Sequence, residues 1–186
     1  MACEDEDFRE FVVSRWVALV RFAFLLTGDV GHAEDVVQTV LERAWRQWSK
    51  VRIERPEAYL RTAITRQAVS RYRWLRRRVT EEPLSVTAGA APVVADGTGD
   101  RALRELLWSE TRRLPARMRA VVVLRVWEGL SEAEAAEMLG CSAGSVKSQL
   151  SRGLARLRRS ESLRAEAAER RFDLGTDMIT KGGEAR

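Results

Sequence analysis

The chain has 186 residues, of which 45% are hydrophobic and 32% are charged, so it can bury a core and is not a fully disordered protein. Its two cysteines and single histidine exclude a disulfide framework, a four-ligand zinc site and most histidine-based catalysis. Arg15 and Arg21 interrupt the longest apolar stretch, and the acidic start, residues 4–7, is unlike a secretory signal. We therefore expect a cytoplasmic protein without membrane insertion, cofactor or metal.

Positive charge gathers in two stretches of the chain, residues 56–80 and residues 101–160. Residues 56–80 hold seven arginines against one acid, and residues 141–160 hold five bases and no acid. Residues 81–100, between them, hold four acids and no base. Two separate basic stretches predict a polyanion that is bound at two places, although each stretch alone is also compatible with a solvated helix surface.

Three amphipathic helices are predicted in the first part of the chain. Apolar side chains recur with helical spacing from Phe8 to Leu26 and again from Ala33 to Trp48, with a glycine-containing break between them. Pro56 suits the first position of a third helix. We expect these helices to form one small bundle over residues 1–78.

Residues 79–100 interrupt the helical periodicity. Proline and glycine stand there among serine, threonine and alanine, a composition typical of a flexible linker. Helical spacing returns at Arg101, but the stretch Ala120–Trp127 is ambiguous because its β-branched residues favour a strand locally. A single strand without a partner strand would leave its backbone N–H and C=O groups without hydrogen bonds, so we predict a helix there. The expected fold is all-α, with two small helical domains whose relative arrangement a flexible linker leaves open.

The strongest local pattern lies in residues 131–158. Ser131 and Glu134 have the spacing of a capping box at the start of a short helix, and Gly140 suits the left-handed residue that ends it. Ser142 then caps a second helix. The apolar positions of that helix are Val146, Leu150, Leu154 and Leu157. A short helix, a turn with glycine and a basic amphipathic helix predict a helix-turn-helix.

The other face of this second helix carries hydrogen-bond donors and no acid. Lysine, arginine, glutamine and serine contact base edges and phosphates when a helix enters the major groove. The alternative is an ordinary helical hairpin with a solvated basic face. The residues that we expect to bind DNA are Ser145, Lys147, Ser148, Ser151, Arg152 and Arg156.

Three motifs together resemble the extracytoplasmic-function sigma factors. They are AEDVVQ at residues 33–38, PEAYL at residues 56–60 before the arginine-rich stretch, and the pattern of residues 131–158. The phrases FREFVVSRW, LLTGD and RAVVVLRVWEGLSEAEAAEMLGCSAGSVKSQLSRGLARL are most similar to the actinobacterial SigE-type subgroup. The resemblance covers roughly residues 8–159.

The resemblance implies a non-enzymatic subunit that recruits core RNA polymerase to promoter DNA and takes no small-molecule substrate. Residues 1–78 would bind core polymerase and the minus-ten element, and residues 101–159 would bind the minus-thirty-five element. Residues 160–186 form a tail to which we assign no role. The resemblance also allows an anti-sigma factor as a partner. The implied polymerase-binding residues are Asp35, Gln38, Glu42 and Arg43.

The arginine-rich helix would face promoter DNA. Its arginines could neutralise phosphates, and Tyr72 would either stack on an unpaired base or pack on the bundle. Relatives carry asparagine where Arg66 stands and paired aromatics where Arg71 and Tyr72 stand, so we expect phosphate contact from these arginines and not base recognition. The candidates on this helix are Arg61, Arg66, Arg71, Tyr72 and Arg73.

Other classes of protein make different predictions. A LuxR-type regulator, the main alternative, would bind operators without joining polymerase and would carry an upstream domain of alternating strands and helices, which residues 1–78 do not show. An all-α adaptor for an acidic protein would bind without regard to promoter sequence. An enzyme is the least supported class, because one histidine and two cysteines are too few for the usual nucleophile–base pairs and metal clusters.

Overall fold

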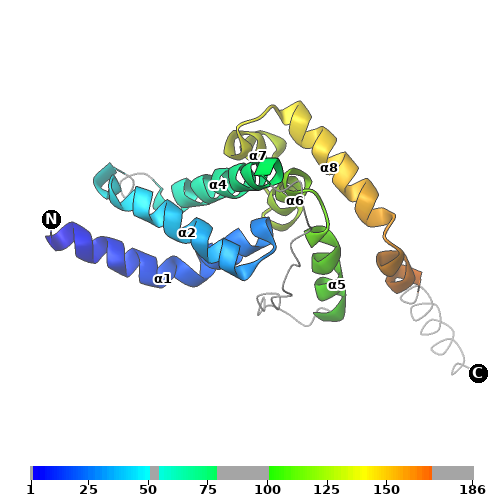
Figure 1. Ribbon diagram of the computed structural model, residues 1–186, viewed down its shortest axis with the longest axis horizontal. Helices are drawn as coiled ribbons and strands as arrows, with labels where there is room; N and C mark the ends of the chain where they lie inside the picture. Colours follow the sequence, from blue (N-terminus) through cyan, green and yellow to red (C-terminus); the bar gives the residue numbers. More distant parts are fainter. Residues whose placement is uncertain (1, 51–54, 79–100, 169–186) are drawn as a thin grey trace, which may run out of the picture.

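The computed structural model describes residues 2–50, 55–78 and 101–168, and all of their regular structure is helical. The all-α prediction is confirmed for this part of the chain. No helix in it is long and apolar enough to cross a membrane, and no three of its His, Cys, Asp or Glu residues are placed to share a metal ion. The labelled helices are α1 (Ala2–Thr27), α2 (Val30–Trp45), α4 (Pro56–Arg78), α5 (Arg101–Arg112), α6 (Ala116–Val122), η1 (Val123–Trp127), α7 (Glu132–Leu139) and α8 (Ala143–Arg158) (Figure 1). Residues 48–50 and 161–168 are also helical.

The first domain consists of α1, α2 and α4, which pack together as the expected bundle. Gly28 turns the chain between α1 and α2 with a φ of 79°, a value that favours glycine. Asp29 then caps α2 by accepting a hydrogen bond from the His32 backbone N–H at 2.8 Å. This cap explains why α2 begins at Val30, one turn before the start that the apolar spacing indicated at Ala33.

Aromatic rings join the amino-terminal half of α1 to the end of α2 and to Trp48, which follows it. The Phe8 ring centroid lies 5.0 Å from those of both Trp45 and Trp48, and the Phe11 ring lies 5.1 Å from that of Trp48. Trp48 is 4% exposed and belongs to the core, whereas Trp45 is 41% exposed. The helical spacing placed both tryptophans on one face, but only Trp48 is buried.

The second domain consists of α5 to α8. Its central helix, α6, continues into the π-helical turn η1, where the Glu128 N–H bonds to the Val123 carbonyl at 3.0 Å. The helix predicted for the ambiguous stretch Ala120–Trp127 is therefore confirmed. Val121 and Leu124 are fully buried in it, so packing against neighbouring helices outweighs the local β propensity of the valines.

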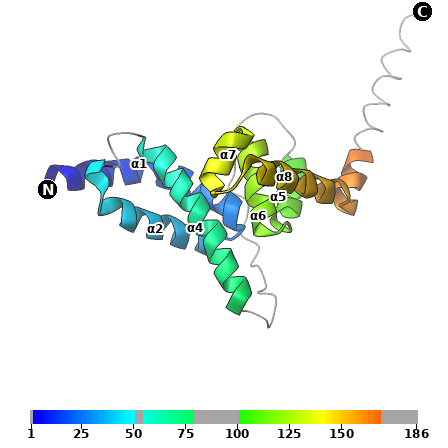
Figure 2. The ribbon, with the colours of Figure 1, turned by 90° about the horizontal axis from the view of Figure 1, so that it is seen from above.

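The two domains lie against each other, with α4 beside α7 and α1 beside α6 (Figures 1 and 2). The ring of Phe24 from α1 lies 5.2 Å from the ring of Trp108 from α5, and one apolar cluster continues across both domains. The predicted linker, residues 79–100, lies outside the described residues. The composition of the chain left the arrangement of the domains open, whereas the structure has them packed together.

Candidate nucleic-acid interface

The turn between α7 and α8 has the geometry that the sequence predicted. The Ser131 Oγ accepts the Glu134 backbone N–H at 3.2 Å, and the Glu134 carboxylate accepts the Ser131 N–H at 2.7 Å. Gly140 ends α7 in the left-handed region, with φ 60° and ψ 48°. Ser142 caps α8 by accepting the Ser145 N–H at 3.2 Å. These local bonds fix how α8 leaves the turn.

The capping box makes the stability of α7 depend on pH. The pKa of Glu134 is held below its ordinary value of 4.5, mainly by a hydrogen bond with the Ser131 side chain and secondly by one with the Ser131 backbone. Both bonds favour the charged carboxylate. A lowered pKa in the folded state means that the carboxylate stabilises the fold above pH 4.5, and that this contribution is lost as the pH falls through the folded-state pKa.

We expect Glu134→Ala to lower the urea midpoint of unfolding at neutral pH and to have a smaller effect well below pH 4.5, where wild type has lost the same bond. Circular dichroism during urea titration at the two pH values measures this. Glu137→Ala, which removes an exposed acid from the same helix, is the control. An effect of Glu134→Ala that is equal at both pH values would contradict the capping role.

A glycine brings α8 close to α6. Val146 and Gly153 are the buried residues of α8, and a Cβ on Gly153 would lie 3.0 Å from Cγ2 of Val122. The predicted apolar positions Leu150, Leu154 and Leu157 are only partly buried. Sequence reasoning missed Gly153, although a glycine seven residues after Val146 in a predicted helix is a signal of close backbone approach.

Gly153→Val is expected to destabilise the protein by about 2 kcal/mol, because its side chain has no space against Val122. Urea unfolding measures the free-energy change. Gly144→Val is the matched control, since no atom lies within 4 Å of a Cβ at that position in the same helix. Equal stability of the two variants would show that the approach of α8 to α6 is not tight.

The outward face of α8 is basic and accessible. Ser145 and Ser148 are partly buried, and the Ser148 hydroxyl donates to the Ser145 carbonyl at 3.0 Å. The hydroxyls of Ser142 and Ser145 lie 2.9 Å apart. The hydroxyls of Ser145 and Ser148 therefore form contacts with neighbouring residues of their own helix end. The predicted DNA-binding residues that are exposed are Lys147, Ser151, Arg152 and Arg156. In Figure 1, α8 lies at the outer side of the second domain, away from α1 and α2.

The predicted polymerase-binding residues lie on the exposed side of α2. Asp35, Gln38 and Glu42 follow the spacing of one helix face, and all three are exposed. Arg43 is exposed beside them, and its Nη1 donates to Oε1 of Gln67 on α4 at 3.2 Å. The opposite side of α2 is buried in the bundle. The helix therefore presents acidic, amide and basic groups together on its outer surface.

Arg61 on α4 is turned toward the second domain. Its guanidinium forms an ion pair with Glu57 at 3.3 Å, one turn earlier, and another with Glu128, which follows η1. It also lies 5.0 Å from the ring centroid of Phe22. A candidate for phosphate contact is thus held between two carboxylates.

Arg66, one turn further along α4, donates to the backbone of α7. Its Nη2 bonds to the Glu137 carbonyl at 3.0 Å, and its Nε bonds to the Met138 carbonyl at 3.2 Å. Both carbonyls belong to the last turn of α7, and the Glu137 carbonyl also accepts the Gly140 N–H at 3.2 Å. Helix α4 continues through the remaining candidates, whose side chains lie outside the described residues: Arg71, Tyr72 and Arg73.

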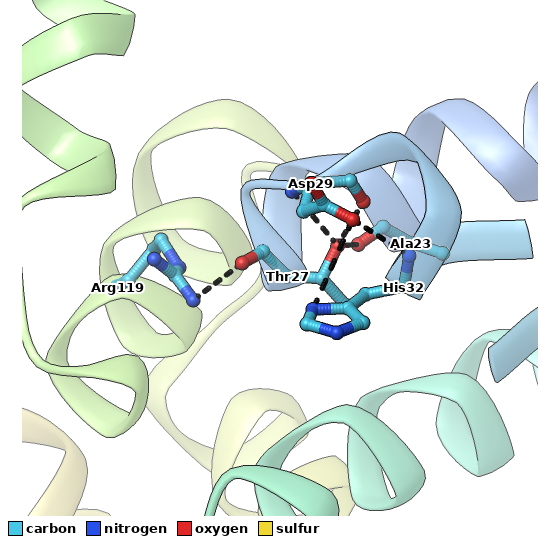
Figure 3. A network of polar contacts seen from close by, with 5 residues as sticks. All are labelled: Ala23, Thr27, Asp29, His32 and Arg119. Atoms are coloured by element: carbon cyan, nitrogen blue, oxygen red, sulfur yellow. Dashed lines mark hydrogen bonds and ion pairs between the residues drawn. The ribbon is translucent and has the colours of Figure 1, made fainter. Parts of the chain in front are cut away.

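Arg119 is a buried residue that sequence reasoning missed. It is 6% exposed, and its guanidinium donates to the carbonyls of Leu26 at 2.9 Å, Thr27 at 2.8 Å and Arg112 at 2.9 Å. Figure 3 shows Arg119 reaching the Thr27 carbonyl at the end of α1. Its position on the buried side of α6, three residues after Ala116, is the signal that could have identified it.

Two family models match the chain. The model for Sigma-70 region 2 matches residues 13–78, on α1, α2 and α4, and the model for Sigma-70 region 4 matches residues 104–157, on α5 to α8. The RNA polymerase sigma-E factor of Streptomyces coelicolor is 40% identical over 168 residues, covering 88% of this chain and 93% of that protein. The ECF RNA polymerase sigma factor SigL of Mycobacterium tuberculosis is 33% identical, covering 71% of this chain and 76% of that protein.

Two solved structures share the fold of this chain. The sigma factor RpoE of Bartonella quintana, solved with the anti-sigma factor NepR, is 28% identical with a TM-score of 0.64, covering 86% of this chain and 98% of that one. CnrH, solved with the cytosolic domain of CnrY, has a TM-score of 0.52 at 24% identity, a likeness of fold alone. With both sigma-70 regions matched along the chain and a relative at 40% identity over most of its length, the chain belongs to the sigma-70 family as an extracytoplasmic-function RNA polymerase sigma factor.

Proposed function

We propose that α8 binds the minus-thirty-five element of promoters and that the exposed face of α2 binds core RNA polymerase. The observation that carries the first part is the outward surface of α8, where Lys147, Arg152 and Arg156 are exposed and residues 141–160 contain no acid. A capped helix with such a face suits a major groove, where it meets both phosphates and base edges. The match of region 4 over this domain supports the same role.

The proposal for α2 rests on its two-sided character. One side is buried against α1 and α4, and the other exposes Asp35, Gln38 and Glu42 in successive turns. Asp29 caps this helix, and Asp35 lies beyond its first turn. Compensation of the helix dipole at the amino terminus therefore does not account for Asp35, because that effect fades within the first turn.

Helix α4 supplies the proposed contact with the minus-ten element. Arg61 and Arg66 would grip phosphates there, together with the arginines that follow them on the same helix. In the described structure both guanidinium groups are bonded to protein acceptors, so this contact requires them to change partners.

Run-off transcription with purified core polymerase tests the proposal. We expect wild type to direct initiation, Asp35→Ala to lose it through weaker polymerase binding, and Lys147→Ala/Arg152→Ala to lose it with polymerase binding intact. Glu10→Ala, which removes an exposed acid from α1 and leaves the α2 face intact, is the control for the loss of one surface carboxylate. Binding of the chain to DNA without any binding to core polymerase would instead favour the LuxR-type alternative.

We further propose that the chain acts in the cytoplasm as a non-enzymatic subunit, without a cofactor or small-molecule substrate. An anti-sigma factor is proposed as an additional partner, because the 28% identical RpoE was solved with one. A run-off assay that contains only core polymerase, template, nucleotides and Mg²⁺ tests whether the chain needs a cofactor. A requirement for any other small molecule would contradict the proposal.

A further inference from the structure

We propose that Gln67 on α4 contacts the minus-ten strand through its amide nitrogen, and that Arg43 on α2 positions that amide. This inference rests on the proposed function of α4 and adds a residue that neither the charge pattern nor the resemblance indicated. Helices α2 and α4 lie side by side in the first domain (Figures 1 and 2). An exposed hydrogen bond between Arg43 and Gln67 joins the two helices.

This hydrogen bond sets the orientation of the Gln67 amide. Nη1 of Arg43 donates to Oε1 of Gln67 at 3.2 Å. The two ends of a glutamine amide have nearly the same shape, but a guanidinium carries only donors, so the amide atom that faces it must be the oxygen. The amide nitrogen is therefore left for another acceptor.

The amide nitrogen is accessible to such an acceptor. Gln67 is half-buried, and no hydrogen bond of its Nε2 is found within the described residues. The buried side-chain nitrogens that have no partner in this part of the chain belong to Trp48, Trp108 and Arg125. Because Nε2 of Gln67 is not among them, it reaches the surface. Its two N–H groups suit the oxygens of phosphates and the acceptors on base edges.

The position of Gln67 on α4 fits a contact with the minus-ten strand. Gln67 follows Arg66 and lies one helical turn before Arg71, and both arginines are candidates for phosphate contact. The neighbouring residues Ile64 and Ala68 are buried, so the bundle holds this turn of the helix in place. Arg66 donates to carbonyls of α7, whereas the nitrogen of Gln67 has no acceptor in the described part of the protein.

Arg43 is a positioning residue in this arrangement. It follows Glu42 on the exposed side of α2 and bonds to α4 through Gln67. Without Arg43, the amide can turn either end outward, and the oxygen end cannot donate to an acceptor on nucleic acid. We therefore expect the loss of Arg43 to weaken this contact only while Gln67 is present.

Binding of the assembled holoenzyme to a fork template with single-stranded minus-ten bases tests the contact. The template comes from a promoter that is active in the run-off assay. The holoenzyme is purified away from free subunits, so that a change in polymerase affinity does not enter the measurement. Gln67→Met removes the amide without adding charge and should weaken binding by about tenfold. Equal binding of Gln67→Met and wild type would overturn the proposal.

A double-mutant cycle tests the positioning role. Arg43→Met should weaken binding by about threefold in wild type and cause no further loss in Gln67→Met, because residues in direct contact are energetically coupled. Arg43→Lys keeps a donor and should restore part of the affinity. Arg46→Met is the matched control, because it removes an exposed arginine one turn later on α2 and its effect should not depend on Gln67. An equal loss from Arg43→Met in both backgrounds would overturn the positioning role.

Modified templates identify the acceptor. A methylphosphonate replaces one charged phosphate oxygen by a methyl group, and a base substitution changes the acceptors on a base edge. If the difference between wild type and Gln67→Met disappears at one methylphosphonate, the acceptor is a phosphate. If it disappears at one base substitution, the acceptor is a base edge. A difference that persists on every template would mean that Gln67 acts through the fold, and it would overturn the proposal.

The outcomes separate the role of Gln67 from the proposed function. Failure of wild type to direct run-off transcription would reject the proposed function. If wild type directs initiation and Gln67→Met binds the fork template equally well, only the role of Gln67 is rejected.

Discussion

Lys147→Ala/Arg152→Ala is expected to weaken binding to a minus-thirty-five duplex by about 100-fold, because each side chain supplies a contact of about 1–3 kcal/mol to base edges or phosphates. Both side chains are exposed on the outward face of α8 and neither packs in the core, so the fold should be preserved. Fluorescence anisotropy with labelled duplex, at several salt concentrations, measures the affinity.

The salt dependence of this binding identifies the kind of contact that is lost. Removing two cations that neutralise phosphates should reduce the slope of log affinity against log salt by about 2. Arg164→Ala removes an exposed arginine beyond the end of α8 and should leave both the affinity and the slope almost unchanged. A similar loss in Arg164→Ala would show that only net charge matters, and the proposed role of the α8 face would be wrong.

Phe24→Ala is expected to reduce the free energy of unfolding by about 4 kcal/mol, the typical cost of removing a large aromatic side chain from a core. Phe24 is 2% exposed, and its ring contacts Trp108 of the second domain at a centroid distance of 5.2 Å. The substitution would therefore leave a cavity where the first domain meets the second. Urea unfolding followed by circular dichroism measures the change.

Val17→Ala provides the control for Phe24→Ala. Val17 lies on the same helix but is 66% exposed, so its truncation should change the stability by less than about 0.5 kcal/mol. A loss below about 1 kcal/mol for Phe24→Ala would mean that the ring is not enclosed as described. The difference between two apolar residues of one helix thus tests the packing of α1 against its neighbours.

The features that could be predicted from the sequence are those encoded within a few residues. Ser131 and Glu134 specify a helix start because their side chains bond to backbone groups three positions away. Gly140 specifies a helix end because glycine adopts the left-handed conformation without strain. The outward face of α8 followed from its helical period, which separated Lys147 and Arg152 from Val146.

The helical spacing of apolar residues predicts less well how deeply each side chain is buried. The apolar spacing of α8 correctly placed Val146 inward, but it did not show that Gly153 makes the closest approach to α6. It also assigned Trp45 and Trp48 to one face without showing that Trp45 would be exposed. Periodicity gives the direction of a side chain, whereas the depth of its burial depends on the shape of the neighbouring helix.

The sequence by itself determined the helical fold, the helix-turn-helix, the exposed face of α2 and the membership of the sigma factor family. Only the tertiary structure decided how the domains meet and which arginines are engaged there. Arg119 bonds to the Leu26 carbonyl 93 positions earlier, and Arg66 bonds to the Glu137 carbonyl 71 positions later. No local pattern specifies such a pair, because a guanidinium has five N–H donors that can bond to many kinds of acceptor, and the packing of whole helices selects the acceptor that it meets.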